Sequence, residues 1–259
     1  MFLAIDVGNT QSTLGLFDDE GQLAKGWRMA SNASDTSDML HARLFSYFLK
    51  DGYKLADVSA AAVASVVPAL TRAWWRCLGD LLGRSPLLVN ATHDYGMPID
   101  MPNPRTVGAD RIANAIAARN AYGSPVIVVD FGTATNIDVV DNRGAYRGGA
   151  ISPGLMLSAN ALFSKAAKLA SIPVEAPEHA LGDTTETAMQ SGLVIGAAAQ
   201  AEGLVSRMKA ELGIEQAKVI GTGGLARTVS RATDLFDAVD STLTLRGIRE
   251  IWLQQHGGA

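Results

Sequence analysis

The chain has 259 residues, 47% hydrophobic and 19% charged, so it can bury one large core or two ordinary ones and is not a disordered segment. The net charge is -4 with scattered lysines and arginines, which argues against binding to nucleic acid or to an anionic membrane. No apolar run reaches the roughly 20 residues of a membrane span. The one cysteine, Cys77, cannot form an internal disulfide, so we expect a cytoplasmic protein with Cys77 packed in its core.

The first half of the chain alternates predicted strands and helices. A strand over residues 1–8 is followed by a strand, a turn and a strand over residues 13–27. Apolar spacing and capping residues predict the elements that come next: a helix over 36–52, a strand over 60–67, a helix over 70–83, a strand over 86–90 and a helix over 109–123.

The second half begins the same pattern again. A strand over residues 125–132 leads into a hairpin over residues 133–149. The remaining predicted elements are a helix over 154–169, a long helix over 184–213, a strand over 217–224 and a final helix over 241–257.

The two halves resemble each other in sequence. Residues 5–8 align with residues 129–132, and after a one-residue gap the segments 16–18 and 139–141 align, each followed by a turn glycine. Chance is the alternative, because Asp-x-Gly is common at strand ends, but the matched hairpins argue for a duplication. We therefore predict an α/β protein of two similar domains, residues 1–121 and 122–259, that face each other across a cleft.

Both aligned strands end in Asp-x-Gly, at Asp6 to Gly8 and at Asp130 to Gly132. The glycine lets the backbone turn tightly and approach a ligand, and the turn can present N–H groups to phosphate oxygens. The aspartate repels phosphate but can hold a cation that binds it. Two such turns could grip a polyphosphate, and the glycines of residues 222–224 could approach a nucleotide or simply form a tight turn.

Several familiar sites are absent from the sequence. It has no G-x-x-x-x-G-K-[ST] phosphate loop, no protein-kinase signature set and no G-x-S-x-G nucleophile motif. No cysteines and histidines have the spacing of a zinc site, and the four histidines are scattered. The two Asp-x-Gly turns are therefore the main candidates for chemistry.

Several motifs together resemble the type III pantothenate kinase family, and the resemblance extends over nearly the whole chain. The motifs are Asp6-x-Gly8-Asn9-Thr10, Gly108-x-Asp110-Arg111, Asp130-x-Gly132-Thr133, Gly148-Gly149 with Pro153-Gly154, Thr185-x-x-Ala188-Met189-Gln190-Ser191-Gly192, Thr222-Gly223-Gly224 and Leu243-Thr244-Leu245-x-Gly247. Each motif alone is only moderately specific, but their joint presence, in this order and at this spacing, is strong evidence for the resemblance. The resemblance implies two actin-like, ribonuclease H-like α/β domains of the acetate and sugar kinase superfamily, with an ATP cleft between them.

The resemblance also implies an activity. The family transfers the γ-phosphate of ATP to the primary hydroxyl of pantothenate, the first step of coenzyme A synthesis. It is associated with Mg²⁺, with a monovalent cation such as potassium or ammonium, and with a homodimer. This chain is accordingly expected to bind ATP and pantothenate, to act as a phosphotransferase and to pair with a second copy of itself.

Residue roles follow from the same resemblance. The residues implied in ATP binding are Asp6, Val7, Gly8, Asn9, Thr10, Gln11, Ser12, Thr13 and Thr133. The residues implied in substrate binding are Met101, Gly108, Ala109, Asp110, Arg111 and Thr185. Asp130 is implied as the monovalent cation ligand, Asp6 as a magnesium ligand either directly or through water, and Asp110 as the proton acceptor.

The chemistry of Asp110 and Arg111 agrees with these roles. Asp110 begins a predicted helix, where the helix dipole favours the ionised carboxylate and makes it a weak base. A weak base suffices when the hydroxyl loses its proton late in phosphoryl transfer. Arg111 can pair with the pantothenate carboxylate through two hydrogen bonds. The alternatives are a helix-capping role for Asp110 and a surface ion pair for Arg111.

Two departures from the family pattern leave other functions open. Met101 stands where the family usually has tyrosine, and residues 136–138 read Asn-Ile-Asp where it usually has Thr-Phe-Asp. The first removes a polar aromatic contact to the substrate, which allows a related kinase with another small substrate. A nucleotide-binding regulatory paralogue without catalysis and a filament-forming actin-like protein are the remaining alternatives.

Overall fold

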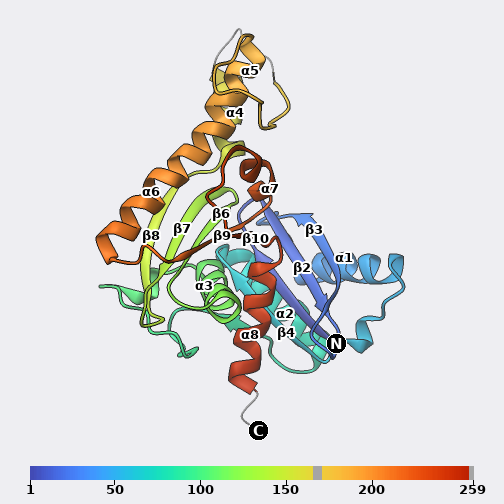
Figure 1. Cartoon of the computed structure of the whole chain (residues 1–259). Coiled ribbons are helices and arrows are strands. Elements are labelled where there is room, and N and C mark those ends of the chain that lie inside the picture. The colour runs from blue at the N-terminus through green and yellow to red at the C-terminus, as the bar shows by residue number, and fades with distance from the viewer. Residues whose placement is uncertain (166–170, 257–259) are drawn as a thin grey trace. The chain divides into compact units, whose positions relative to one another are not determined.

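The computed structural model describes residues 1–165 and 171–256, which form two compact units (Figure 1). The first unit comprises Met1–Gly96, Asn103–Ala117 and the segment that begins at Leu243. The second unit comprises Met97–Pro102 and Ala118–Thr242. Each unit contains one five-stranded sheet.

The first sheet has the strand order β3-β2-β1-β4-β5, in which β2 is antiparallel to both β1 and β3, and β4 and β5 are parallel to β1. Its strands are β1 (Phe2–Val7), β2 (Gln11–Phe17), β3 (Leu23–Ala30), β4 (Ala60–Ser65) and β5 (Leu87–Val89). Helices α1 (Ser37–Lys50) and α2 (Pro68–Leu82) pack against this sheet through buried side chains such as Phe48 and Trp74. Cys77 of α2 is buried there, which confirms the predicted packed cysteine, and burial raises the pKa of its thiol to about 12.

The second sheet has the order β8-β7-β6-β9-β10 and the same directions as the first. Its strands are β6 (Val126–Phe131), β7 (Ala134–Val140), β8 (Tyr146–Pro153), β9 (Lys218–Thr222) and β10 (Ala238–Val239). Between β8 and β9 the chain forms α4 (Leu155–Lys165), α5 (Thr185–Gln190) and α6 (Gly196–Leu212), and the short α7 (Ala226–Val229) follows β9. Helix α6 lies along this sheet (Figure 1) and buries Ala198, Ala201 and Val205 in its core.

The duplication predicted from the sequence is confirmed by the strand order and by two identical hairpin turns. In the first unit Asp18 N–H donates to the Gln22 carbonyl at 3.0 Å, and in the second Asp141 N–H donates to the Ala145 carbonyl at 2.9 Å. Each turn contains a glycine of positive φ, and each hairpin has its irregularity in register at the same place, between residues 16 and 17 and between 139 and 140. The two sheets therefore share one strand order and one hairpin geometry, as a duplication predicts.

The one-residue gap of the sequence alignment lies in the turn after the first strand. Gly8 N–H donates to the Gln11 carbonyl at 3.1 Å, three residues ahead. Gly132 N–H donates to the Ala134 carbonyl at 3.0 Å, two residues ahead. The turn of the second unit is thus one residue shorter, while the aspartates before both turns keep the same position in their strands.

The C-terminal helix α8 (Leu243–His256) belongs to the first unit. The Thr244 hydroxyl donates to Asn114 Oδ1 of α3 (Ala109–Tyr122) at 2.8 Å, and the rings of Trp252 and Phe2 have centroids 5.1 Å apart. The predicted division into residues 1–121 and 122–259 differs from this arrangement. Sequence order places α8 with the second repeat, but its buried side chains pack on the first sheet, which spacing along the chain does not reveal.

Other predicted elements correspond closely to the structure. The helix predicted over residues 184–213 runs from Thr185 to Leu212, with one π-helical turn at Ser191–Ile195 between α5 and α6. The helix predicted over 154–169 is present as Leu155–Lys165, and the rest of that prediction falls outside the described residues. Among the described residues, no helix combines the length and hydrophobicity of a membrane-spanning segment.

Candidate active site

The first Asp-x-Gly turn places one carboxylate beside a row of exposed polar residues. Asp6, half-buried, is the fifth residue of β1 and lies directly opposite Thr13 of β2. Residues 9–11, which are Asn, Thr and Gln, are exposed at the turn between these strands. Side chains opposite each other on antiparallel strands share one face of the sheet, so the carboxylate and the Thr13 hydroxyl project on the same side.

Ser31, the residue that follows β3, forms hydrogen bonds with this turn and with β2. Ser31 N–H donates to the Thr10 carbonyl at 3.0 Å, and the hydroxyls of Ser12 and Ser31 share a hydrogen bond of 2.8 Å. Ser12 and Val7 are buried, so a ligand at this turn would meet the exposed residues and the backbone rather than these two side chains. Sequence reasoning missed Ser31, because no motif links it to the turn.

The glycines of the two turns differ in what they require. Neither Gly8 nor Gly132 has a positive φ, so tight turning does not demand glycine at either position. A Cβ on residue 8 would lie 3.0 Å from the Gln11 carbonyl oxygen, which is a close approach within the hairpin itself. On residue 132 a Cβ would have no heavy atom nearer than 3.5 Å, with Asp130 Oδ1 at 3.6 Å.

The second turn gathers three separate motifs around Asp130. Asp130 of β6 pairs in register with Asn136 of β7 and with Thr222 of β9. The backbone after Thr222 passes so close that a Cβ on Gly223 would lie 2.7 Å from the backbone of Phe131. The exposed Thr133 accepts a hydrogen bond at its carbonyl from Gly154 N–H at 3.1 Å. The turns at 132–133, 153–154 and 222–224 therefore form one polar cluster in the second unit.

Asp110 lies in the first turn of α3. The residue is half-buried, but its Oδ1 atom is fully buried and has no hydrogen-bond partner among the described residues. Burial raises the pKa of the Asp110 carboxyl. Three smaller effects lower it without cancelling this shift: a hydrogen bond from Arg111 N–H, the charge of Arg111 and a hydrogen bond from Asp110 N–H. The first turn of the helix thus favours the ionised form, as expected, but desolvation outweighs it, so the carboxylate is a stronger base than the weak one predicted.

The remaining predicted substrate residues fall in different places. Gly108 precedes α3, where its carbonyl accepts from Ile112 N–H at 3.1 Å, and Ala109 is buried. Met101 belongs to the second unit, where its side chain lies over the backbone of Gly148. Thr185 is exposed at the start of α5, after Thr184, which caps that helix.

The described residues include no cluster of three His, Cys, Asp or Glu side chains that could hold a metal alone. Mg²⁺ commonly binds one or two carboxylates together with substrate phosphates and water. The single carboxylate of Asp6, beside a hydroxyl and an exposed turn, fits that mode of binding.

Comparisons with known proteins identify the family. A family model described as type III pantothenate kinase matches residues 2–207. The chain is 43% identical to a type III pantothenate kinase of Thermomicrobium roseum over 99% of this chain and 98% of the relative. It is 42% identical to one of Moorella thermoacetica, over 97% and 98% of the two chains. This chain belongs to the type III pantothenate kinase family.

Solved structures support the predicted fold. Component A of (R)-2-hydroxyglutaryl-CoA dehydratase from Acidaminococcus fermentans has a TM-score of 0.58 at 15% identity, covering 100% of this chain and 99% of that one. The inorganic polyphosphate/ATP-glucomannokinase of an Arthrobacter strain has a TM-score of 0.51 at 15% identity, covering 98% of both chains. With the repeated strand order, these likenesses confirm the predicted fold of two similar α/β domains.

Proposed function

We propose that this chain carries out the reaction of its family, the phosphorylation of pantothenate in coenzyme A biosynthesis, with ATP as the phosphoryl donor. One observation carries the proposal. The central strand of each sheet ends with a carboxylate, and an exposed turn follows it in both units. Phosphoryl transfer requires positioned phosphates, neutralised charge and a proton acceptor, and the chain has residues suited to each task.

The turn between β1 and β2 is the proposed binding site for the ATP phosphates. Residues 9–11 are exposed and can donate to phosphate oxygens, while Val7, Gly8 and Ser12 contribute backbone. Asp6 and Thr13 supply a carboxylate and a hydroxyl, so we assign magnesium binding to Asp6, directly or through water. When bound there, the cation would neutralise charge on the phosphates.

The cluster of the second unit is the proposed monovalent cation site. Asp130 is half-buried beside backbone that approaches closely at residue 223, and carboxylate and carbonyl oxygens suit potassium or ammonium. Thr133, exposed in the same turn, is the proposed phosphate contact. A cation at Asp130 would offset the negative charge of the carboxylate near a bound nucleotide.

Asp110 is the proposed proton acceptor. The primary hydroxyl of pantothenate forms a bond to the γ-phosphorus, the bond to ADP breaks, and the hydroxyl proton passes to the Asp110 carboxylate. Its raised pKa supports this role, because a stronger base accepts the proton more readily than an ordinary carboxylate. Arg111 is the proposed partner of the pantothenate carboxylate.

The other substrate contacts are proposed for Gly108, Ala109, Met101 and Thr185. Met101 replaces a polar aromatic residue of the family pattern with an apolar thioether. A panel of pantothenate and related small alcohols tests whether pantothenate is the preferred acceptor. A higher kcat/KM with another alcohol would overturn the assignment of substrate.

We also propose a cytoplasmic homodimer. Ile151 of β8 and Met156 and Leu157 of α4, which are close together in the sequence, are apolar side chains with exposed fractions of 64%, 43% and 53%. Exposed apolar side chains that gather in one place commonly mark an interface, and a second copy of the chain is the partner implied by the family. Light scattering of the wild type and of Ile151→Asp tests this, because loss of a dimer in the variant alone supports the proposal.

A coupled assay of ADP release tests the catalytic proposal. Release that requires pantothenate, ATP and Mg²⁺ together, and that increases with potassium, supports it. ATP binding without any pantothenate-dependent release would favour a regulatory paralogue instead.

A further inference from the structure

The segment Met97–Pro102 is attached to the edge of the second sheet, although the chain on either side of it belongs to the first unit. Tyr146 N–H donates to the Pro98 carbonyl at 2.8 Å, and Asp100 N–H donates to the Tyr146 carbonyl at 2.9 Å. These bonds pair Ile99 with Tyr146 as a parallel bridge at the start of β8. Tyr146 is fully buried, and its hydroxyl donates to Asp138 Oδ1 at 2.6 Å, so the residue that binds the segment is itself held within the sheet.

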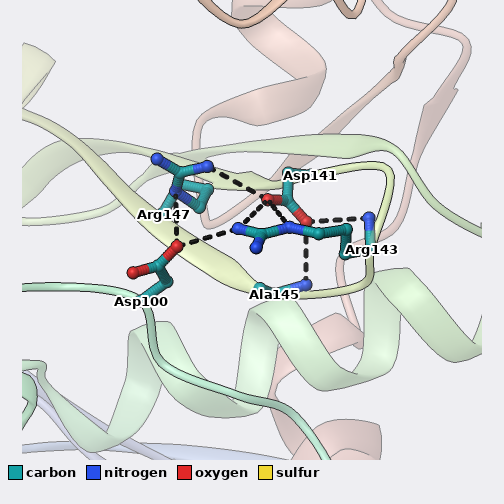
Figure 2. Close-up of polar contacts among 5 residues, drawn as sticks. All are labelled: Asp100, Asp141, Arg143, Ala145 and Arg147. Carbon is teal, nitrogen blue, oxygen red and sulfur yellow. Dashed lines mark hydrogen bonds and ion pairs between the residues drawn. The ribbon is translucent and has the colours of Figure 1, made fainter.

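Two arginines of the adjoining hairpin hold the same segment through Asp100 (Figure 2). Arg143 Nη2 lies 2.8 Å from Asp100 Oδ2, and Arg147 Nε lies 3.6 Å from that atom. Both arginines also contact Asp141 Oδ2, at 3.0 and 3.1 Å. Burial would raise the pKa of Asp141, but hydrogen bonds from Ala145 N–H, Arg147 and Arg143 lower it overall, so Asp141 is an anion that orients both arginines.

The residue after Asp100 is Met101, the proposed substrate contact. A Cβ on Gly148 of β8 would lie 3.5 Å from both the Sδ and the Cε atoms of Met101. The methionine side chain therefore lies over the place that a Cβ at residue 148 would occupy, on the strand whose Tyr146 bonds to Asp100. Because Asp100 precedes Met101, holding Asp100 in place also positions the backbone from which the Met101 side chain extends.

The first repeat provides an internal comparison. Its hairpin has the same backbone turn, with Asp18 in the place of Asp141, but Glu20 and Ala24 stand where the second repeat has Arg143 and Arg147. Asp18 Oδ1 accepts from Gln22 N–H at 2.7 Å, as Asp141 Oδ1 accepts from Ala145 N–H at 3.1 Å. The turn thus forms without arginines, and in the second repeat they serve another purpose.

We infer that Asp100, held by Arg143 and Arg147, is a positioning residue that places Met101 and so determines how tightly the enzyme binds the pantothenate-type substrate. This inference rests on the proposed function. The ion pairs are partly exposed, since Arg143 has an exposed fraction of 67% and Asp100 of 54%, so their effect should be moderate.

Steady-state kinetics of Asp100→Asn, Arg143→Gln and the double variant test the inference. Each single variant should raise the KM for pantothenate by about three- to tenfold, with kcat and the KM for ATP nearly unchanged. The double variant should have a KM for pantothenate no higher than that of the more impaired single variant, because both changes break the same contact. Asp100→Glu, which keeps the charge, should restore most of the affinity, and Glu20→Gln is the matched control in the first repeat.

Two results would overturn the inference. One is an unchanged KM for pantothenate in Asp100→Asn, and the other is a parallel rise in both KM values together with a lower melting temperature, which would indicate general loosening. Failure of the proposed function is seen separately, in the wild type, as an absence of pantothenate-dependent ADP release, and it would remove this inference as well.

Discussion

The backbone of Gly108 lies directly against the carboxylate of Asp110, so that a Cβ on residue 108 would come within 2.5 Å of Asp110 Oδ1. That oxygen is also buried, and Val66 Cγ1 lies 3.7 Å from the same Cβ position. The glycine of the Gly-x-Asp-Arg motif therefore leaves room for the proposed proton acceptor.

Gly108→Ala should displace the Asp110 carboxylate and lower kcat while the fold persists, because the methyl meets the end of a side chain rather than backbone. A displacement of about 1 Å can cost roughly 10²-fold in rate. Kinetics and thermal melting of the variant check this. The matched control is Gly203→Ala in helix α6, where a Cβ meets no atom within 4 Å; equal kcat in both variants would contradict the role of Gly108.

Asp110→Asn should separate catalysis from stability. Without the base, kcat should fall by roughly 10² to 10⁴ while ATP still binds. Because the folded-state pKa of Asp110 is raised, its ionisation disfavours the folded state at neutral pH, and this cost disappears as pH falls through that pKa. The variant should therefore melt higher than wild type at pH 7, with the difference shrinking in acid. A lower melting temperature at pH 7 would indicate a capping role instead.

Wild-type activity should also decline in acid because of the same group. A base must be deprotonated to accept the hydroxyl proton, so kcat/KM should fall as pH drops through the raised pKa of Asp110. The acid limb should consequently lie above the ordinary aspartate range of about 3.9. A pH profile that stays flat down to that range would exclude Asp110 as the acceptor.

The two turn glycines provide a paired test of phosphate binding. Gly132→Ala should melt like the wild type, because its methyl would make only ordinary van der Waals contacts, yet that methyl beside Asp130 should lower kcat/KM for ATP by about ten- to a hundredfold. Gly8→Ala should weaken both the fold and ATP binding, since its methyl meets the Gln11 carbonyl. Calorimetric ATP titrations and melting curves are the measurements. If Gly132→Ala binds and turns over ATP normally, its turn is only a hairpin connection.

Potassium dependence tests the role of Asp130. Activity should require potassium or ammonium, and sodium should substitute poorly, because the proposed site holds a weakly hydrated monovalent ion. Asp130→Asn should lose most of this dependence together with most of the activity. Full wild-type turnover in sodium buffer freed of potassium would sink the proposal.

The duplication could be predicted from sequence because its signal is local. Asp6 and Asp130 hold the same position in similar strands, and the hairpins after them repeat an aspartate and a glycine in their turns, so short-range patterns are sufficient. The long helices were predictable for the same reason, since amphipathic spacing and caps lie within each segment.

The features that sequence did not reveal depend on packing between distant segments. Helix α8 follows the second repeat but buries Leu245 and Ile248 with the first unit. Desolvation of Asp110 reverses the effect expected of the helix terminus, and it depends on what surrounds the carboxylate rather than on its place in a motif. The contact between Asp100 and Arg143 joins residues 43 positions apart, with no pattern to connect them.

The most direct measurement is ADP release by the wild type and by Asp110→Asn, with ATP, Mg²⁺, potassium and pantothenate present, and with the product identified by its mass. The account predicts pantothenate-dependent release and phosphorylated pantothenate from the wild type, and a loss of about 10² to 10⁴ in kcat for the variant. Wild-type ATP turnover that does not respond to pantothenate, or a variant as active as wild type, would contradict it.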